Sequence, residues 1–310
     1  VSRSCLAFAP FALSLSKGLL NSHGCWIVSV AQPRPLSRIS MCRLLAYSGD
    51  PIFLEEFVCK PQHSLVRQSM QADESKVSTN GDGFGIGWYT GYDGHTAPGI
   101  YREVMPAWSD ENLLALCSAV RSPLFFAHVR ATTGTAVARQ NCHPYRFDHY
   151  LFMHNGQIGD YAKVRRQLEA ALPDELYAAR KGATDSELMF LLAMAHVQRG
   201  AAPVDAMREM LTDVRAAMES RGIRAPLRFA AALSDGQQVF AFRYASDDKP
   251  PSLYVNRCDH GTVVASEPLQ DRANDCCPEW TPVPPNTAVT VARGQVASEP
   301  FFVEAMAASQ

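Results

Sequence analysis

The chain has 310 residues, a formal net charge of -2 and 47% apolar residues, as expected for a globular protein with one large core or two modest ones. Charges of both signs are interspersed along the sequence, without the basic stripe that binding to nucleic acid requires, so we predict no nucleic-acid partner. The nine cysteines occur without CxxC pairs, which argues against zinc and redox sites and favours a reducing cytoplasm in which most thiols are buried.

Residues 1–41 differ in pattern from the rest of the chain. The apolar run from Leu6 to Leu15 superficially resembles a secretory signal, but proline and serine interrupt it and it is too short to span a bilayer. Sustained periodic patterns begin only at Met41. We therefore expect translation to start naturally at Met41, with a disordered leader or a pro-segment as the alternative. The remaining residues, 42–310, are predicted to form one domain without membrane contact.

Short apolar segments bounded by turn residues dominate the chain after Met41, a pattern typical of β-strands. The predicted strands are Cys42–Tyr47, Gly83–Tyr89, Gly99–Arg102, Leu124–Arg130, Tyr150–His154, Leu227–Leu233, Val239–Tyr244, Thr262–Ala265 and Thr287–Ala292.

A helical block separates the first five of these strands from the last four. Its predicted features are a helical face formed by Val164, Leu168, Ala171 and Leu172, a helix over Pro173–Ala179, a capping box at Thr184-Asp185-Ser186-Glu187 before an apolar run that ends at Gly200, and a last helix from Pro203. Strands, then helices, then strands predict an α+β protein in which helices cover two sheets.

Cys42 follows Met41 directly and is the candidate nucleophile. By residue type alone it could be an ordinary buried strand cysteine. Its position indicates more, because a cysteine is small enough for the initiator methionine in front of it to be removed. The α-amine that this leaves has a pKa of about 7.7 to 8.0 and can accept the thiol proton near neutral pH.

Asn155-Gly156 follows a predicted strand, where this pair is typical of a type I′ turn. The same two residues could act differently. A side-chain amide and a glycine backbone N–H at a strand end are two neutral donors suited to a tetrahedral oxyanion. Both interpretations remain open at this point.

Arg130 and Asp185 could form a receptor for the charged end of an α-amino acid. Arg130 ends an apolar run and could be a solvated cation, but an enclosed guanidinium would bind a carboxylate with two hydrogen bonds. Asp185 could be only a carboxylate favoured by the start of a helix, or it could bind an ammonium group.

Two further patterns do not indicate a site. The glycine-rich segment Asn80–Gly87 runs into a strand and no helix follows it, which argues against a phosphate cradle. Four histidines at positions 128, 143, 149 and 154 lack the helical i, i+4 spacing of a zinc site. We therefore predict no metal.

The chain resembles the class II glutamine amidotransferases through five motifs in matching order and spacing. These are Met41-Cys42-Arg43-Leu44-Leu45, His128-Val129-Arg130-Ala131-Thr132-Thr133-Gly134, Asn141-Cys142-His143-Pro144, His154-Asn155-Gly156 and Thr184-Asp185-Ser186-Glu187. Two segments, Asn80–Gly85 and Phe152–Gly156, look most like a stand-alone amidotransferase-like branch. That branch includes the glutamine-hydrolysing subunit of the fungal glutathione-degradation complex.

The resemblance implies a four-layer αββα sandwich of the N-terminal-nucleophile hydrolase type. It also implies roles for individual residues. Cys42 would be the nucleophile, and Asn155 and Gly156 would form the oxyanion hole. Arg130 would bind the substrate's carboxylate and Asp185 its ammonium, and Thr133 and His143 would line the pocket. One departure is that Gly134 stands where the larger synthases have a histidine after the threonine. We therefore expect this loop to close differently, without tight coupling to a synthase.

The predicted reaction is attack of the Cys42 thiolate on a γ-glutamyl amide such as glutamine, release of ammonia or an amine, and hydrolysis of the γ-glutamyl thioester to glutamate. No cofactor is expected. A partner subunit could accept the ammonia. Two alternatives remain, a hydrolase of γ-glutamyl peptides or metabolites with a glutathione-like substrate, and a catalytically silent glutamine-binding subunit. The silent subunit would follow if residues 1–41 stayed attached and blocked the α-amine.

Overall fold

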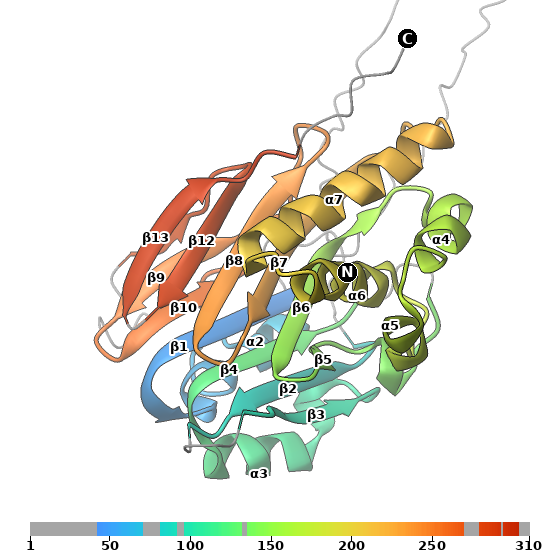
Figure 1. Cartoon of the computed structure of the whole chain (residues 1–310). Coiled ribbons are helices and arrows are strands. Elements are labelled where there is room, and N and C mark those ends of the chain that lie inside the picture. Colours follow the sequence, from blue (N-terminus) through green and yellow to red (C-terminus); the bar gives the residue numbers. More distant parts are fainter. Residues whose placement is uncertain are drawn as a thin grey trace, which may run out of the picture. The chain divides into compact units, whose positions relative to one another are not determined.

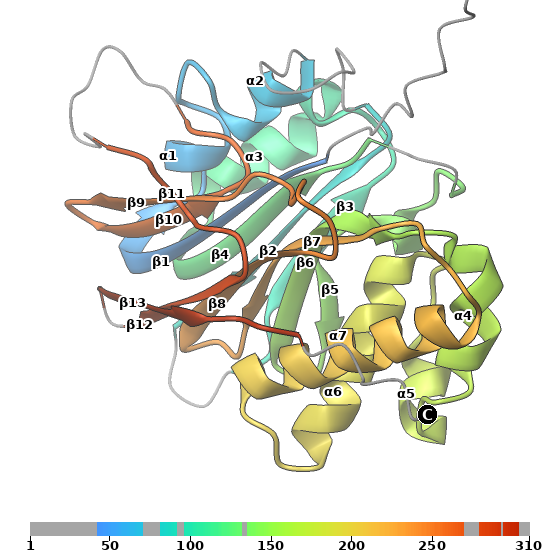
Figure 2. The ribbon, with the colours of Figure 1, turned by 90° about the horizontal axis from the view of Figure 1, so that it is seen from above.

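The computed structural model describes residues 42–70, 81–91, 96–131, 135–269, 279–292 and 294–303. These residues belong to one compact unit, residues 39–310. Two antiparallel sheets stack at the centre of this unit, and helices cover both outer faces, as Figures 1 and 2 show. The predicted α+β class and the four-layer order of helices, sheet, sheet and helices are confirmed.

The first sheet has, in spatial order, strands β11 (Thr281–Pro282), β9 (Tyr254–Cys258), β10 (Gly261–Ala265), β1 (Arg43–Phe53), β4 (Arg121–Val129), β2 (Phe84–Tyr89) and β3 (Gly99–Glu103). The second sheet has, in the same way, β13 (Gln295–Pro300), β12 (Thr287–Ala292), β8 (Gln238–Ala245), β7 (Leu227–Ser234), β6 (Tyr150–Ile158) and β5 (Tyr145–Phe147).

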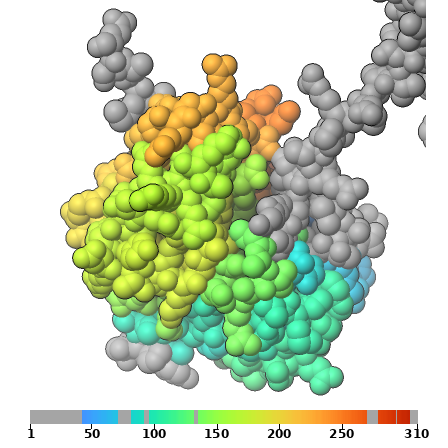
Figure 3. All heavy atoms as spheres, turned by 90° about the vertical axis from the view of Figure 1, so that its right-hand side faces the viewer, coloured from blue at the N-terminus to red at the C-terminus, as the bar shows by residue number. Residues whose placement is uncertain are grey.

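Helices from two parts of the chain form the outer layers. The first sheet is covered by α1 (Glu55–Val58), α2 (Leu65–Met70) and α3 (Glu111–Ala119), and the second by α4 (Tyr161–Glu169), α5 (Asp174–Ala179), α6 (Asp185–Gln198) and α7 (Pro203–Ser220). Two 3-10 turns, η1 (Ala107–Ser109) and η2 (Arg139–Asn141), lie in connecting segments. In Figure 3 the yellow-green helical block lies above the teal segment that contains β3 and α3.

Strand β1 shows how the layers arise from the sequence. Successive side chains of a strand point to opposite faces, so Leu44 and Ala46 pack between the sheets while Leu45 and Tyr47 pack under the helices. A strand buried on both faces reads as a continuous apolar run. This packing fixes the start of β1, and therefore the position of Cys42, which precedes it directly and is partly buried.

The predicted helical block is present, with one change at its capping box. Thr184 caps α6 as predicted, since its Oγ1 accepts from the Glu187 N–H at 3.1 Å. Glu187 does not return a hydrogen bond to Thr184. Its carboxylate instead accepts from the N–H groups of Lys181 and Gly182, at 3.0 and 2.6 Å, and so fixes the segment that leads into α6.

Several expectations were incomplete or wrong. The sequence did not predict helices α1 to α3, and the first helical face ends at Glu169, before Ala171 and Leu172. Of the five described cysteines, all free thiols, only Cys117 and Cys142 are buried, so the expectation that most thiols are buried does not hold for this part of the chain. Among the described residues, no helix is long and apolar enough to cross a membrane.

Candidate functional site

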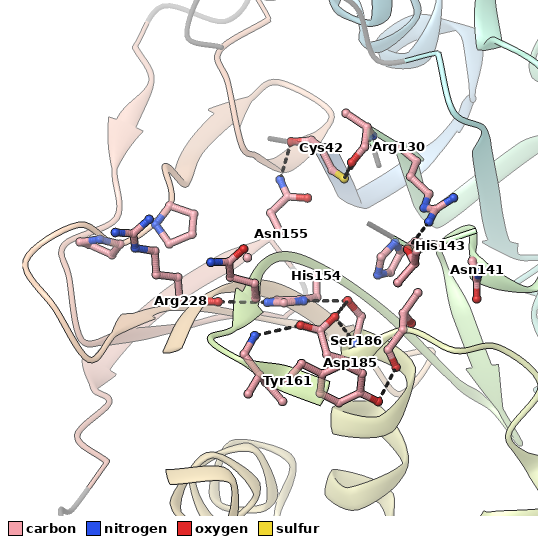
Figure 4. A pocket seen from close by; sticks show the side chains of 18 of the residues that line it. Cys42, Arg130, Asn141, His143, His154, Asn155, Tyr161, Asp185, Ser186 and Arg228 are labelled. Carbon is pink, nitrogen blue, oxygen red and sulfur yellow. Dashed lines mark hydrogen bonds between the residues drawn. The ribbon is translucent and has the colours of Figure 1, made fainter. Parts of the chain in front are cut away.

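A cavity of about 560 Å³ opens beside the start of β1. Its walls come from the segment after β4, strand β6, the first turn of α6 and the loop after β8. The predicted site residues that line it are Cys42, Arg130, His143, Asn155, Gly156 and Asp185. Figure 4 shows Cys42, Arg130, His143, Asn155 and Asp185 around one space. The remaining predicted residue, Thr133, lies outside the described residues, as do Met41 and Gly134.

Cys42 stands immediately before β1, with its sulfur against the backbone of Ala131. The Ala131 N–H donates to Sγ at 3.4 Å, and the thiol lies 3.5 Å from the Ala131 carbonyl oxygen. Burial raises the pKa of the Cys42 thiol, although the Ala131 hydrogen bond and the charge of Arg130 act against this rise. A thiol with a raised pKa is protonated near neutral pH, so the site needs a base before the sulfur can attack a carbonyl carbon.

The side chain of Asn155 reaches back to the residue that carries the nucleophile. Its Nδ2 donates to the Cys42 carbonyl oxygen at 2.8 Å, and its Oδ1 lies 3.2 Å from Nε2 of His128. An amide oxygen only accepts hydrogen bonds, so the proton of the neutral His128 ring must be on Nε2. Burial lowers the pKa of His128 to about 3, which keeps the ring neutral. These contacts fix the orientation of the Asn155 amide.

Asn155-Gly156 is not a turn. Both residues lie within β6, paired with Ala230 and Phe229 of β7, so the strand runs four residues beyond its predicted end at His154. Gly156 has a φ of 140°, and a Cβ there would lie 1.9 Å from the Arg228 carbonyl oxygen. Only glycine fits this position.

The strand also determines where the Gly156 N–H points. The Ile158 N–H donates away from β7, to Asp185 Oδ2 at 2.9 Å. In a strand, N–H groups two residues apart point to the same edge. β5 pairs with β6 only as far as Phe152, so this edge is not covered by β5 at position 156. The alternation of a regular strand would therefore direct the Gly156 N–H to the edge of β6 that borders the cavity.

Arg130 is enclosed rather than solvated, since only 4% of it is exposed. Its guanidinium donates to Thr135 Oγ1 at 2.6 Å and to the carbonyl oxygens of Ala136 and Asp82 at 3.3 and 3.5 Å. These acceptors carry no charge, and no carboxylate forms an ion pair with Arg130 in the part of the chain that the structure describes. An enclosed cation of this kind can bind an anionic group in the cavity.

Asp185 is the first residue of α6, so its carboxylate stands at the start of a helix, where negative charge is favoured. Its Oδ1 accepts from the Ser186 N–H and its Oδ2 from the Ile158 N–H, both at 2.9 Å. It also lines the cavity and is only partly buried. The Ser186 hydroxyl also donates to Oδ1, at 3.4 Å. An ionised carboxylate has about four lone-pair sites, so these three bonds still leave capacity for a ligand ammonium.

The comparison with protein families identifies the chain. The family model for class II glutamine amidotransferases matches residues 41–257, more than half of the sequence. The chain belongs to the class II glutamine amidotransferases. The probable glutamine amidotransferase DUG3 of Saccharomyces cerevisiae is 30% identical over 85% of each chain. The gamma-glutamyl-hercynylcysteine sulfoxide hydrolase of Mycolicibacterium smegmatis is 27% identical over 84% of this chain and 100% of that protein.

Solved structures agree with this assignment. A class-II glutamine aminotransferase domain protein from Silicibacter pomeroyi is 34% identical, with a TM-score of 0.63 over 84% of this amidotransferase and 99% of that chain. The glutamine phosphoribosylpyrophosphate amidotransferase of B. subtilis has a TM-score of 0.57 at 16% identity, covering 85% of this chain and 50% of its own. At this identity the likeness concerns the fold alone, and the shared fold agrees with the two stacked sheets between helical layers.

Three neutral histidines surround the site of this amidotransferase. The ring of His143 lies 4.2 Å from that of His128, and His154 Nδ1 lies 2.9 Å from Ser186 Oγ. Burial lowers the pKa of all three imidazoles. His143 lines the cavity, and its two ring nitrogens are buried without a hydrogen-bond partner among the described residues.

The fourth histidine, His149, is not part of this group, since it contacts Asp148 and Tyr150. Within the described ranges, no three His, Cys, Asp or Glu side chains are grouped so as to hold a metal ion.

A buried ion pair that the sequence patterns did not predict lies beside the nucleophile. Arg43 is 1% exposed, donates to the Cys42 carbonyl oxygen at 3.3 Å and places Nε 2.5 Å from Glu267 Oε2. His63 lies 2.9 Å from the other oxygen of Glu267. Although burial acts in the opposite direction, His63 and Arg43 lower the pKa of Glu267. The arginine inside an apolar strand was a sign in the sequence that a buried ion pair exists here. Its partner could not be predicted, because Glu267 comes from a distant segment of the chain.

Proposed function

We propose that this amidotransferase hydrolyses glutamine and related γ-glutamyl amides, with Cys42 as the nucleophile once the residues before it are removed. The observation that carries the proposal is that Cys42, the Asn155 amide and the enclosed Arg130 line one cavity. Family membership supports it. So do the names of the two relatives, one a glutamine amidotransferase and the other a hydrolase of a γ-glutamyl conjugate.

The base in this proposal is the α-amine of Cys42 itself. An α-amine has a pKa of about 7.7 to 8.0, so roughly a fifth to a third of it is neutral near physiological pH and can accept the thiol proton. Sγ then attacks the δ-carbon of the γ-glutamyl amide. The proton passes to the leaving nitrogen as the C–N bond breaks, and water hydrolyses the γ-glutamyl thioester to glutamate and the free thiol.

The oxyanion that forms during attack would be stabilised by two donors. One is the Asn155 amide, which His128 and the Cys42 carbonyl hold in place, and the other is the N–H of Gly156. Donors that are already oriented stabilise the transition state without a cost of reorganisation during the reaction.

The α-amino-acid end of the substrate would bind between two charges. Arg130 would take the α-carboxylate and Asp185 the α-ammonium, while His143 and Thr133 would line the pocket. Water is the acceptor of the γ-glutamyl group in this proposal, and a partner subunit is needed only where the ammonia is passed to another substrate.

The test compares three proteins: the chain expressed from Met41, its Cys42→Ala variant, and the chain that retains residues 1–41. Glutamate release from glutamine and from other γ-glutamyl amides is measured. We expect release by the first protein alone. Equal activity of the Cys42→Ala variant would refute the proposal. Glutamine binding without hydrolysis by the protein that begins at Cys42 would instead establish a silent binding subunit.

A further inference from the structure

The cavity continues beyond Cys42 to a wall formed by the loop between β8 and β9. The residues of this part of the lining are Arg228, Arg243, Lys249, Pro250, Pro251 and Ser252. Because β8 belongs to the second sheet and β9 to the first, the loop crosses the edge of the sandwich beside the nucleophile. We call residues 247–252 the loop wall.

Arginines of the second sheet hold the loop wall from one side. Arg228 Nη2 lies 2.7 Å from Asp247 Oδ2, and Arg243 Nε donates to the Pro251 carbonyl oxygen at 2.8 Å. The Arg228–Asp247 pair is neutral as a unit.

The first sheet holds the loop wall from the other side, close to the nucleophile. Ser252 Oγ donates to the Ser266 carbonyl oxygen at 2.7 Å. Ser266 Oγ in turn accepts from the N–H of Leu44 at 3.0 Å, two residues after Cys42. The position of the wall relative to Cys42 is therefore set by a short chain of hydrogen bonds.

The charges that line the cavity are unequal. The lining residues include four cations and one carboxylate, namely Arg130, Arg228, Arg243, Lys249 and Asp185. The α-amino-acid end of the substrate uses Arg130 and Asp185. In Figure 4, Arg228 lies across Asn155 from Arg130. Arg228 and Arg243 hold the loop wall, and Lys249 is part of it, so these three cations belong to the far end of the cavity. The charge of Arg228 is balanced by Asp247, which leaves Lys249 as the cation that the wall itself offers to a ligand. Lys249 is exposed there, and its ammonium forms no ion pair with a carboxylate among the described residues.

We propose that the loop wall is a subsite for a carboxylate on the leaving amine. The preferred substrates are then γ-glutamyl peptides or conjugates whose amine half ends in a carboxylate. This inference rests on the proposed function, which places the γ-glutamyl δ-carbon at Cys42 and its charged end at Arg130. The leaving amine then extends toward Lys249, where a carboxylate meets positive charge. Ammonia released from glutamine has no group that could reach the wall.

The test uses substrate pairs of equal size that differ in one charge. γ-Glutamylglycine is compared with γ-glutamylglycinamide, and γ-glutamylalanylglycine with its C-terminal amide, by kcat/KM for glutamate release. Because the lysine is exposed, we expect a preference for the free acid of about fivefold, corresponding to about 1 kcal/mol. The preference should decrease at high ionic strength, where exposed charges are screened.

Variants of Lys249 separate a role in binding from a role in folding, since an exposed loop side chain contributes little to stability. Lys249→Met should bring the acid-to-amide ratio close to one, and Lys249→Glu should bring it below one. Lys163→Met is the matched control, because Lys163 is an exposed lysine of α4 that does not line the cavity. This control should keep the ratio of the parent protein.

A ratio near one in the parent protein overturns the subsite, and so does a ratio that Lys249→Glu leaves unchanged. Glutamate release in the same assays would still support the proposed function. If neither glutamine nor any γ-glutamyl peptide releases glutamate, the proposed function itself fails, and the subsite falls with it.

Discussion

Replacement of Asn155 by Asp tests the oxyanion hole most directly. In the parent protein, Nδ2 donates to the Cys42 carbonyl oxygen at 2.8 Å and Oδ1 faces His128 Nε2 at 3.2 Å. An aspartate keeps the size and the contact with His128, but it places a second oxygen against the Cys42 carbonyl. The variant thus loses the oxyanion donor and gains a repulsive contact at the nucleophile.

The magnitude follows from the loss of one preorganised donor, which lowers turnover by about 100- to 1000-fold, or roughly 2.7 to 4 kcal/mol. Asn155→Asp should be at least as harmful as Asn155→Ala, because only the aspartate adds repulsion. KM for glutamine should change much less, since a ground-state carbonyl is a weaker acceptor than the oxyanion.

Steady-state kinetics with glutamine measure these effects, and circular dichroism with thermal melting shows whether the variants fold. Asn112→Asp is a matched control, because it makes the same change at an exposed position of α3. Its turnover should equal that of the parent. If both Asn155 variants fold and turn over within about threefold of the parent, the assignment of Asn155 as oxyanion donor is wrong.

Three further predictions concern processing, binding and pH. Protein made from its natural gene should begin at Cys42 by intact mass spectrometry, and full activity with residues 1–41 attached would contradict the α-amine base. Arg130→Ala and Asp185→Ala should each lose roughly 2 to 5 kcal/mol of glutamine binding, since each leaves a charge enclosed without its partner; unchanged KM values in both would show that the pocket is misplaced. Burial lowers the pKa of His128 to about 3 in the folded protein. As pH falls below about 6.5, this histidine is protonated in the unfolded chain but stays neutral in the folded one, so the free energy of unfolding decreases. The melting temperature should therefore fall between about pH 6.5 and 5, above most carboxylate pKa values, and a flat profile there would contradict a buried neutral imidazole.

Local patterns were sufficient for many elements of the fold. Apolar segments between turn residues predicted strands such as β2 and β7, and the Thr184 cap predicted the start of α6, because neighbours along the chain determine these features. Helix α3 was missed, although Asp110 caps it by accepting from the Leu113 N–H at 2.8 Å. A short helix with a narrow apolar face has a weak periodic signal.

The sequence alone was enough to single out the candidate residues, because Cys42, Asn155 and Gly156 lie in motifs with recognisable order and spacing. It left Asn155-Gly156 open between a turn and an oxyanion hole, since the two residues have the same local preferences in both. Pairing with β7 decided against the turn.

Only the tertiary structure decided the environment of each charge. Arg130 could have been a solvated strand end, and its enclosure depends on segments that pack around it from elsewhere in the chain. The ion pair of Arg43 with Glu267 and the position of Lys249 at the cavity likewise join residues far apart in sequence. Burial and charge pairing are properties of distances in space, whereas periodicity and motif spacing are properties of distances along the chain. The sequence therefore determined which groups are available for the chemistry, and the packing of the two sheets decided which of them meet.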